Sequence, residues 1–532
     1  MRRRAVLGAG GAMGAALAAS VALPAPALAQ PTSARVLKFV PQADVSILDP
    51  MVTTGYQTRN HAHMVWDTLY GLDSQFRPHP QLAEGHVVDS DGKRWTFTLR
   101  QGPTFHDGEP VRAADAVASI RRWMTRDTHG QTLAARIETM RALDDRRFEI
   151  NLTRPFGPML DALGKASSYP CFVMPERLAR TPAATAISEI IGSGPYRFKA
   201  DERVSGSQLV YERYGRYVPR EGTPSMTAGP KLAHFDRMEW RIITDAGTAA
   251  AALQAGEVDW LEQVANDLRP VVQRHREVVV DRLDSSGIKA MLRPNHLHAP
   301  FDTAERRRAL LPAIAQADYM TAIMGGDRAV WRDGVGCFPV ASPMASDEGI
   351  AAVSGPRSAD AAKSALAAAG YRGETVVFLH ATDVVNTNAI SIVAIDALQK
   401  AGMSVAPATS DWGTVLARRA RKEPPDQGGW NVMVSLFAGA DLMNPGAHLL
   451  LRGNGDGAWF GWPTSPALEA LRDEWFDAPA EAQAGLGRRI QAQFWQDVPY
   501  WPLGQYFTSS AWRRSLTGVM EGMVLPLNVR RA

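Results

Sequence analysis

The sequence predicts an α/β protein built from two or three lobes. Its 532 residues include an N-terminal leader, and the roughly 500 residues that would remain exceed what one hydrophobic core normally supports. From residue 238 onward, apolar runs typical of strands alternate with segments of helical period, which is the order expected of an α/β lobe. A hydrophobic content of 45% and a charged content of 21% place the chain among ordinary globular proteins.

The first 29 residues predict an export signal. Residues 2–4 are all arginine, residues 5–22 are apolar and mostly small, and Ala27-Leu28-Ala29 fits the small-x-small cleavage rule. Residues 3–7 also resemble a twin-arginine signal, so Sec and twin-arginine export remain alternatives. We therefore expect a periplasmic protein whose mature chain begins at Gln30.

The mature chain is expected to carry no net charge. The full chain has 58 Lys and Arg against 55 Asp and Glu, and the leader holds three arginines and no acid. A balanced surface gives no reason to expect nucleic acid or an anionic membrane as a partner. The two cysteines, Cys171 and Cys337, could form a disulfide in an exported protein or remain separate buried thiols.

The individual elements follow from the hydrophobic period. In the first half we expect strands at 36–40, 95–99 and 147–152, with helices at 61–69 and from Ala113. In the second half we expect strands at 238–243 and 376–379, and helices at 248–255, 358–370, 390–401, from Ser465 and at 486–494. Ser358 and Ser465 are predicted helix caps, and Gly256 a helix stop. Residues 192–195 mark a strong break, and residues 418–429 are predicted to form a mobile surface loop.

A series of short motifs covers nearly the whole mature chain. The motifs are Leu48-Asp49-Pro50, Trp66–Tyr70, Pro80–Glu84, Trp95–Val117, Gly192–Phe198, Ala252–Asp259, Pro300–Asp302 with Arg306 and Arg308, Ala369–Tyr371 and Val498–Leu503. In this order and behind an export signal, they resemble the bacterial extracellular solute-binding proteins of family 5. That family includes the oligopeptide-, dipeptide- and nickel-binding components of ABC importers.

The resemblance implies a two-lobed fold of the periplasmic-binding-protein type (type II, cluster C) with three domains. Domain I would comprise residues 31–72, 191–285 and 500–532, domain II residues 73–190, and domain III residues 286–499. A ligand would lie between the lobes, which would close on it by a hinge motion. The resemblance also implies a monomer without cofactor, resident metal or catalytic residues, whose partners are a small solute or peptide and the ABC permease subunits of the inner membrane.

Four candidate ligand-binding residues also come from the resemblance. In peptide-binding members an Asp after an aromatic-containing strand holds the ligand's amino group, and Asp441 falls at that position. Phe437 lies near the family's Trp, Trp412 matches an aromatic that lines a side-chain pocket, and Tyr56 lies in a loop that faces the cleft from domain I. Asp441 could instead brace the turn at residues 444–446, and a Trp in an α/β lobe often belongs to the core.

Two departures from the family pattern bear on the ligand. Dipeptide binders carry an Arg near the start of the helix before Gly402, where this chain reads Asn386-Thr387-Asn388. The family often has an acidic residue before the Pro that follows Asp441, where this chain has Asn444. A free dipeptide is therefore not the favoured ligand, and a longer peptide or another amine-bearing or polar solute fits as well.

Three alternative functions remain. His61 with His63 and His296 with His298 are close histidine pairs, which keep open a nickel- or metal-complex-binding member, although core or surface histidines are favoured. A periplasmic hydrolase is a second alternative, but the chain has no HExxH, GxSxG or P-loop motif and no distinctive carboxylate pair. An accessory protein that presents its solute to a chemosensor would use the same cleft.

Overall fold

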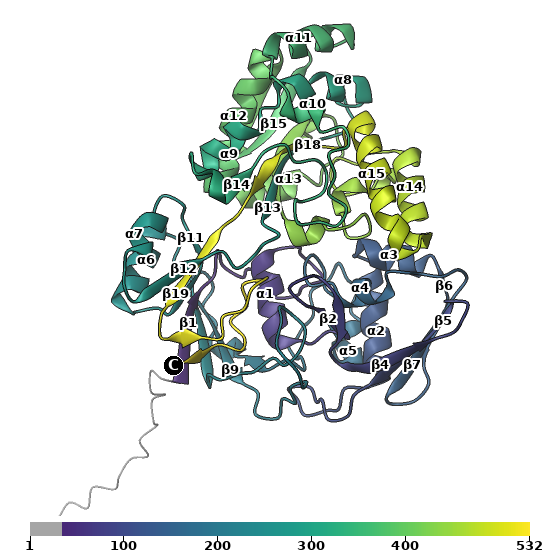
Figure 1. Ribbon diagram of the computed structural model, residues 1–532, viewed down its shortest axis with the longest axis vertical. Helices are drawn as coiled ribbons and strands as arrows, with labels where there is room; N and C mark the ends of the chain where they lie inside the picture. Colours follow the sequence, from purple (N-terminus) through teal and green to yellow (C-terminus); the bar gives the residue numbers. More distant parts are fainter. Residues whose placement is uncertain (1–34) are drawn as a thin grey trace, which may run out of the picture.

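A computed structural model describes residues 35–532, which form two lobes (Figure 1). The chain crosses between the lobes twice. The predicted export signal lies outside the described residues. The lower lobe in Figure 1 holds a seven-stranded sheet and a four-stranded sheet, and the upper lobe holds a six-stranded sheet. Within residues 35–532, no helix combines the length and the apolar character needed to cross a bilayer.

The seven-stranded sheet joins three distant parts of the chain. Its order is β12 (Val278–Asp281), β19 (Ser509–Arg513), β11 (Trp260–Val264), β1 (Val36–Val40), β10 (Arg237–Arg241), β9 (Gln208–Arg213) and β8 (Tyr196–Phe198). Phe39 of β1 fixes the centre, because its ring packs 5.3 Å from Trp240 and 5.6 Å from Trp260 on the two neighbouring strands. The helices α1 (Tyr56–Val65), α6 (Ala246–Ala255) and α7 (Arg269–Gln273) belong to the same lobe.

The four-stranded sheet is antiparallel and carries the predicted half-buried strand. Its order is β4 (Ala83–Val88), β5 (Arg94–Leu99), β7 (Arg147–Leu152) and β6 (Ile137–Ala142). Trp95, Phe97 and Leu99 of β5 are buried, which confirms the alternation. The predicted helix at Ala113 is α2 (Ala113–Met124), and Asp115 in its first turn accepts a hydrogen bond from the Arg112 N–H at 2.8 Å. The neighbouring helices are α3 (Thr128–Ala134), α4 (Met159–Gly164) and α5 (Glu176–Ala179).

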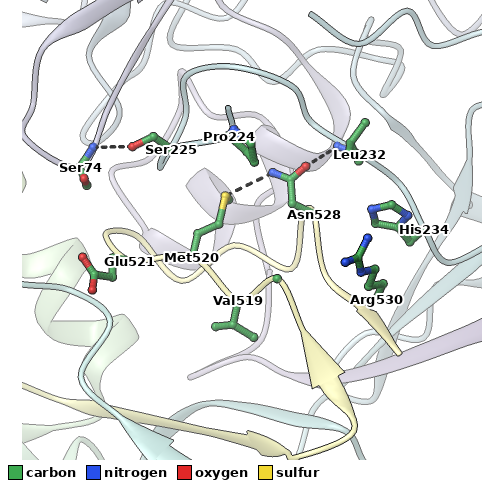
Figure 2. Close-up of a pocket in the computed structure, with 11 residues that line it drawn as sticks. Ser74, Pro224, Ser225, Leu232, His234, Val519, Met520, Glu521, Asn528 and Arg530 are labelled. Carbon is green, nitrogen blue, oxygen red and sulfur yellow. Dashed lines mark hydrogen bonds between the residues drawn. The ribbon is translucent and has the colours of Figure 1, made fainter. Parts of the chain in front are cut away.

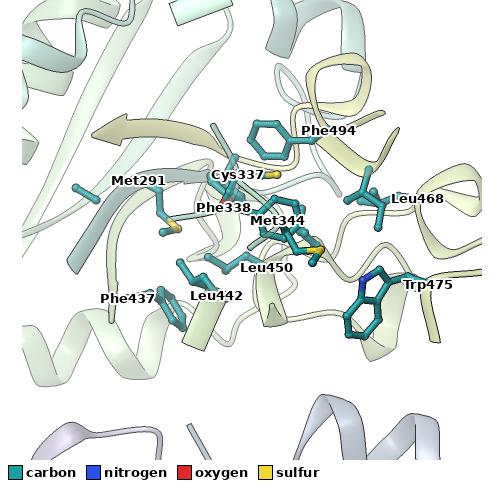
Figure 3. Packing of buried hydrophobic residues seen from close by; sticks show 14 of the residues in the cluster. Met291, Cys337, Phe338, Met344, Phe437, Leu442, Leu450, Leu468, Trp475 and Phe494 are labelled. Atoms are coloured by element: carbon teal, nitrogen blue, oxygen red, sulfur yellow. The ribbon is translucent and has the colours of Figure 1, made fainter. Parts of the chain in front are cut away.

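The upper lobe is an α/β layer structure, as predicted. Its sheet order is β14 (Trp331–Arg332), β18 (Trp501–Tyr506), β13 (Ile288–Pro294), β17 (Val432–Ala438), β15 (Thr375–Ala381) and β16 (Ser404–Ser410). Its main helices are α8 (Ala304–Ala309), α9 (Gln316–Met324), α11 (Ala359–Ala368), α12 (Val385–Lys400), α13 (Trp412–Arg418), α14 (Pro466–Asp477) and α15 (Ala480–Asp497). Leu468 and Trp475 of α14 and Phe494 of α15 pack with Met344 and Leu450 in the core (Figure 3).

Several boundaries differ from the sequence predictions. The helix expected at 61–69 runs from Tyr56 to Val65, and the helix expected at 390–401 begins at Val385. The segment expected to be a mobile loop includes the end of α13 and a short 3-10 turn, Pro425–Gln427. Cys171 and Cys337 are separate buried thiols, and burial raises the pKa of the Cys337 thiol to about 12.

Residues 282–287 and 507–508 form the two crossings between the lobes. Because β18 pairs with β13 in the upper sheet, the last segment returns to the lower lobe after Tyr506 rather than at residue 500. The division into three domains stays a prediction, and the strand pairing favours a last boundary near residue 507. Gly287 has a φ of +61°, and a Cβ there would lie 2.7 Å from the Tyr506 carbonyl oxygen, so this crossing requires glycine.

A buried histidine predicts how stability depends on pH. His61 Nδ1 lies 2.9 Å from the Tyr211 hydroxyl, and burial lowers the pKa of His61 from 6.5 to about 3. Below pH 6.5 the unfolded chain binds a proton that the folded chain does not, so the unfolding free energy falls by about 1.4 kcal/mol per pH unit for such a group. We expect His61→Asn to flatten this fall in urea unfolding between pH 7 and pH 4. His275→Asn is the control, and identical slopes for wild type and His61→Asn would contradict the assignment.

Candidate ligand-binding site

Tyr56 and Asp441 meet where the two lobes touch. Tyr56 is the first residue of α1 in the lower lobe, and Asp441 lies in a 3-10 turn, Gly439–Leu442, directly after β17 of the upper lobe. The Tyr56 hydroxyl donates to Asp441 Oδ2 at 3.1 Å and accepts the N–H of Ala438. The structure thus brings together two of the four predicted residues from opposite lobes, in a closed arrangement.

Asp441 is buried but only half satisfied. Its side chain is 1% exposed, Oδ2 accepts from Tyr56, and Oδ1 has no hydrogen-bond partner within residues 35–532. Burial and the Asp441 charge hold the pKa of Tyr56 well above its usual range, so the phenol stays protonated and donates. The turn at residues 444–446 is braced by Asn444, whose Oδ1 accepts the Ala447 N–H at 2.8 Å. A buried carboxylate oxygen without a partner is costly, so Oδ1 is available to accept a hydrogen bond from a donor that enters the site.

Arg59 is a nearby cation that sequence reasoning did not identify. It follows Tyr56 by three positions on α1, and its Cζ lies 4.7 Å from the Tyr56 ring centroid. Its Nη1 donates to Ser167 Oγ at 2.7 Å. The Arg59 charge partly offsets the rise that burial causes in the pKa values of Glu262 and Asp284. Because this helix was expected to begin at residue 61, the sequence did not place Tyr56 and Arg59 on one helical face.

Phe437 contacts Trp459, and Trp412 packs on the small core that Trp459 also borders. Phe437 is buried near the end of β17, and its ring packs edge-to-face on Trp459 with centroids 5.4 Å apart. Trp412 begins α13, and both Trp412 and Trp459 are half-buried against the small core formed around Trp430 and Trp462. Trp459 therefore contacts one of the two predicted aromatics, Phe437, and shares a neighbouring core with the other. The aromatic run Trp459-Phe460-Gly461-Trp462 in the sequence could have drawn attention to it.

A second cation, Arg419, lies against the same aromatic residues. Its Cζ is 4.6 Å from the Phe460 ring centroid and 5.4 Å from that of Trp459. Its Nε is enclosed and has no hydrogen-bond partner in the described part of the chain. Burial lowers the pKa of Arg419 to about 10, and Tyr169 of the lower lobe partly offsets this fall, so the group stays charged at neutral pH. Arg419 is therefore a cation beside Trp459, the residue on which Phe437 packs.

The lobes also meet at the end of α14. Phe476 stacks on Phe156 of the lower lobe with centroids 5.6 Å apart. The Asp477 carboxylate lies 2.7 Å from Arg136 Nη1 and 3.1 Å from Arg154 Nη1. Arg136 is 1% exposed, so its charge is desolvated in this closed arrangement. This contact contains none of the four predicted ligand-binding residues.

The histidine pairs do not converge on a common site. His61 bonds the Tyr211 hydroxyl, whereas His63 Nε2 bonds the Ala166 carbonyl at 2.9 Å. His296 and His298 bond the carbonyls of Pro499 and Lys422, respectively. Between residues 35 and 532, no group of three or more His, Cys, Asp or Glu side chains is arranged to hold a metal ion.

Two surface hollows lie in the lower lobe. They have volumes of about 470 and 520 Å³ and share Ser74 and Ser225. The smaller one is also lined by His234, Asn528 and Arg530 (Figure 2). None of the four predicted ligand-binding residues lines either hollow.

Comparisons with known proteins agree with this architecture. Solved structures that share the fold include AgaA from A. tumefaciens R10 in complex with agropinic acid, with a TM-score of 0.78, 20% identity, and coverage of 93% of this chain and 99% of that chain. DppA from Helicobacter pylori in complex with the peptide STSA has a TM-score of 0.77 and 20% identity, and covers 93% of this chain and 98% of that chain.

Sequence relatives and a family model give the same result. A probable peptide ABC transporter periplasmic-binding protein of Sinorhizobium fredii (strain NBRC 101917 / NGR234) is 36% identical over 97% of this chain and 98% of its own length. The glutathione-binding protein GsiB of Salmonella typhimurium is 26% identical over 53% of this chain and 54% of its own length. Residues 77–457 match the model described as bacterial extracellular solute-binding proteins, family 5. The chain therefore belongs to the bacterial extracellular solute-binding proteins of family 5.

Proposed function

We propose that this protein is the periplasmic substrate-binding component of an ABC importer and that it delivers a peptide or a related small solute to the permease. The observation that carries the proposal is the unpartnered Oδ1 of Asp441, which is buried where the two lobes meet. A ligand ammonium would supply the missing donor. The protein releases its ligand unchanged, so it performs no covalent chemistry.

The charges along the cleft favour a ligand with a cationic end and an anionic end. Asp441 offers a carboxylate, and Arg419 offers a guanidinium whose Nε has no hydrogen-bond partner in the described chain. Phe437, four residues before Asp441, packs on Trp459, and Trp459 packs on Arg419, each at 5.4 Å. A short peptide has this arrangement of ammonium, apolar side chains and carboxylate.

Closure couples binding to delivery. A ligand that touches both Tyr56 and Asp441 stabilises the closed state by its difference in affinity for the closed and open forms. The closed form is then the one that the permease subunits recognise. Domains that close on a solute in this way need a hinge, and the two short crossings at 282–287 and 507–508 can serve as one.

Native mass spectrometry tests the proposal. The protein is purified without denaturation, and the mass of the bound solute is read before and after unfolding. We expect a peptide or another amine-bearing acid, and we expect exchange with peptides from a casein digest. Failure to bind any component of the digest, or release of shortened peptides, would overturn the proposal.

A further inference from the structure

The loop that carries Trp459 has an uncommon backbone. Gly461 has a φ of +97° and Trp462 a φ of +47°, and for a residue as large as tryptophan the left-handed region is unfavourable. Such a conformation persists only where its surroundings hold it, and it tends to occur at ligand-binding segments. The Trp459–Trp462 loop must therefore be held by residues that pack against it.

Arg293 of β13 binds this loop from inside the lobe. Its side chain is fully buried, its Nε donates to the Phe460 carbonyl at 2.7 Å, and its Nη2 donates to the Trp459 carbonyl at 3.1 Å. Its Nη1 donates to the carbonyls of Leu450 at 3.3 Å and Pro499 at 3.0 Å. One guanidinium thus joins three segments of the upper lobe through four backbone carbonyls.

No carboxylate pairs with Arg293 anywhere in the described chain. Its guanidinium is surrounded by carbonyl oxygens and by the Trp459 ring, whose centroid lies 5.6 Å from Cζ. Burying a cation without a counter-ion is costly, and carbonyl dipoles only partly offset that cost. An apolar residue could not donate to these four carbonyls, so the arginine is what ties the loop to the other two segments.

The loop is also shaped to approach Arg293. A Cβ at Gly461 would lie 2.4 Å from the Pro294 carbonyl oxygen and 2.9 Å from Arg293 Nε, so only glycine fits. The His296 N–H donates to the Gly461 carbonyl at 2.8 Å and fixes the loop from the same side. The Trp459 ring, which lies beside Arg293, also contacts Phe437 and Arg419.

We infer that Arg293 is a positioning residue for ligand binding: its guanidinium fixes the Trp459–Trp462 loop and thereby the aromatic wall between Asp441 and Arg419, without touching the ligand. This inference rests on the proposed function, because the wall matters for binding only if a solute enters the cleft.

The test compares Arg293→Lys with Arg307→Lys. Arg307 is a matched control, since it is also a buried arginine of the upper lobe that donates to three carbonyls (Phe301, Asp497 and Val498) and has no ion pair in the described chain. An ammonium group cannot reach four carbonyls, so we expect Arg293→Lys to weaken the binding of tetra-alanine about tenfold in calorimetry. Arg307→Lys should stay within about twofold of wild type, even where it lowers the melting temperature equally.

A structural readout keeps the test independent of the ligand. In protein labelled with 5-fluorotryptophan, the fluorine resonance of Trp459, assigned with Trp459→Phe, should broaden or split in Arg293→Lys and stay single in Arg307→Lys. If Arg293→Lys does not fold, Gly461→Ala is the second variant. Its added Cβ would push the same loop away from Arg293, so it should both weaken tetra-alanine binding and broaden or split the Trp459 resonance.

The outcomes separate the two proposals. If wild type binds tetra-alanine and both lysine variants lose affinity in proportion to their melting temperatures, Arg293 is a general core residue and the inference is overturned. An unchanged Trp459 resonance in Arg293→Lys and Gly461→Ala also overturns it. If no peptide binds wild type, the proposed function fails, whereas the Trp459 resonance still decides whether Arg293 positions the loop.

Discussion

Replacing Asp441 with Asn is expected to weaken the binding of peptides with a free amino terminus about a hundredfold, because it removes a buried charge and keeps the shape. The carbonyl of the introduced amide can still accept the hydrogen bond from Tyr56, which in wild type reaches Oδ2 at 3.1 Å. The variant should therefore fold and close normally. Isothermal calorimetry with tetra-alanine measures the loss.

The chemical origin of this loss can be isolated. N-acetyl tetra-alanine has no ammonium, so wild type and Asp441→Asn should bind it with the same weak affinity. Asp396→Asn, which removes an exposed carboxylate on α12 that pairs with Lys400, should leave the affinity for tetra-alanine unchanged. If tetra-alanine binds Asp441→Asn as tightly as wild type, then Asp441 does not hold the ligand cation.

Replacing Asp477 with Asn should shift the protein towards the open state. In the closed arrangement Asp477 is the only carboxylate within ion-pair distance of the buried Arg136 in the described chain, at 2.7 Å, and it also pairs with Arg154. The substitution leaves Arg136 desolvated and without its counter-ion in the closed state. We expect this to destabilise closure by about 1–2 kcal/mol, a reduced figure because solvent screens the half-exposed Asp477 carboxylate. We expect an affinity loss of about tenfold that lies mainly in the dissociation rate, measured by stopped-flow fluorescence.

A residue on the same helix provides the control for closure. Glu474→Gln removes an exposed carboxylate of α14 that pairs with Arg489 inside the upper lobe, at 2.6 Å. This variant should keep the dissociation rate of wild type. Equal rates for Asp477→Asn and wild type would show that the contact at the end of α14 does not support closure.

Much of the fold could be predicted because the local signals were strong. Ser358 and Ser465 cap α11 and α14 as expected, with hydroxyl oxygens that accept from Ala361 and Leu468 N–H groups at 3.1 Å. The helices whose starts were misplaced lack such a signal, since α1 follows Gly55 and α12 follows Val384, and neither residue caps its helix with a side chain. Without a capping side chain, the hydrophobic period alone did not locate these two helix starts.

The candidate site was only partly predictable. The resemblance to the family supplied Tyr56 and Asp441, and the structure brings them into contact across 385 residues of sequence separation. It did not supply Trp459, Arg419 or Arg293, because their roles arise from a loop with no hydrophobic period and from carbonyls of three separate segments. Contacts of this kind depend on tertiary packing and not on any local pattern.

Small-angle scattering measured with and without bound solute tests the central claim most directly. The protein is stripped of solute by unfolding and refolding, and scattering is recorded before and after saturation with the solute that mass spectrometry identifies. Ligand capture between the lobes predicts a smaller radius of gyration in the loaded protein and recovery of the solute intact. Identical profiles with and without solute, or conversion of the solute to a product, would contradict it.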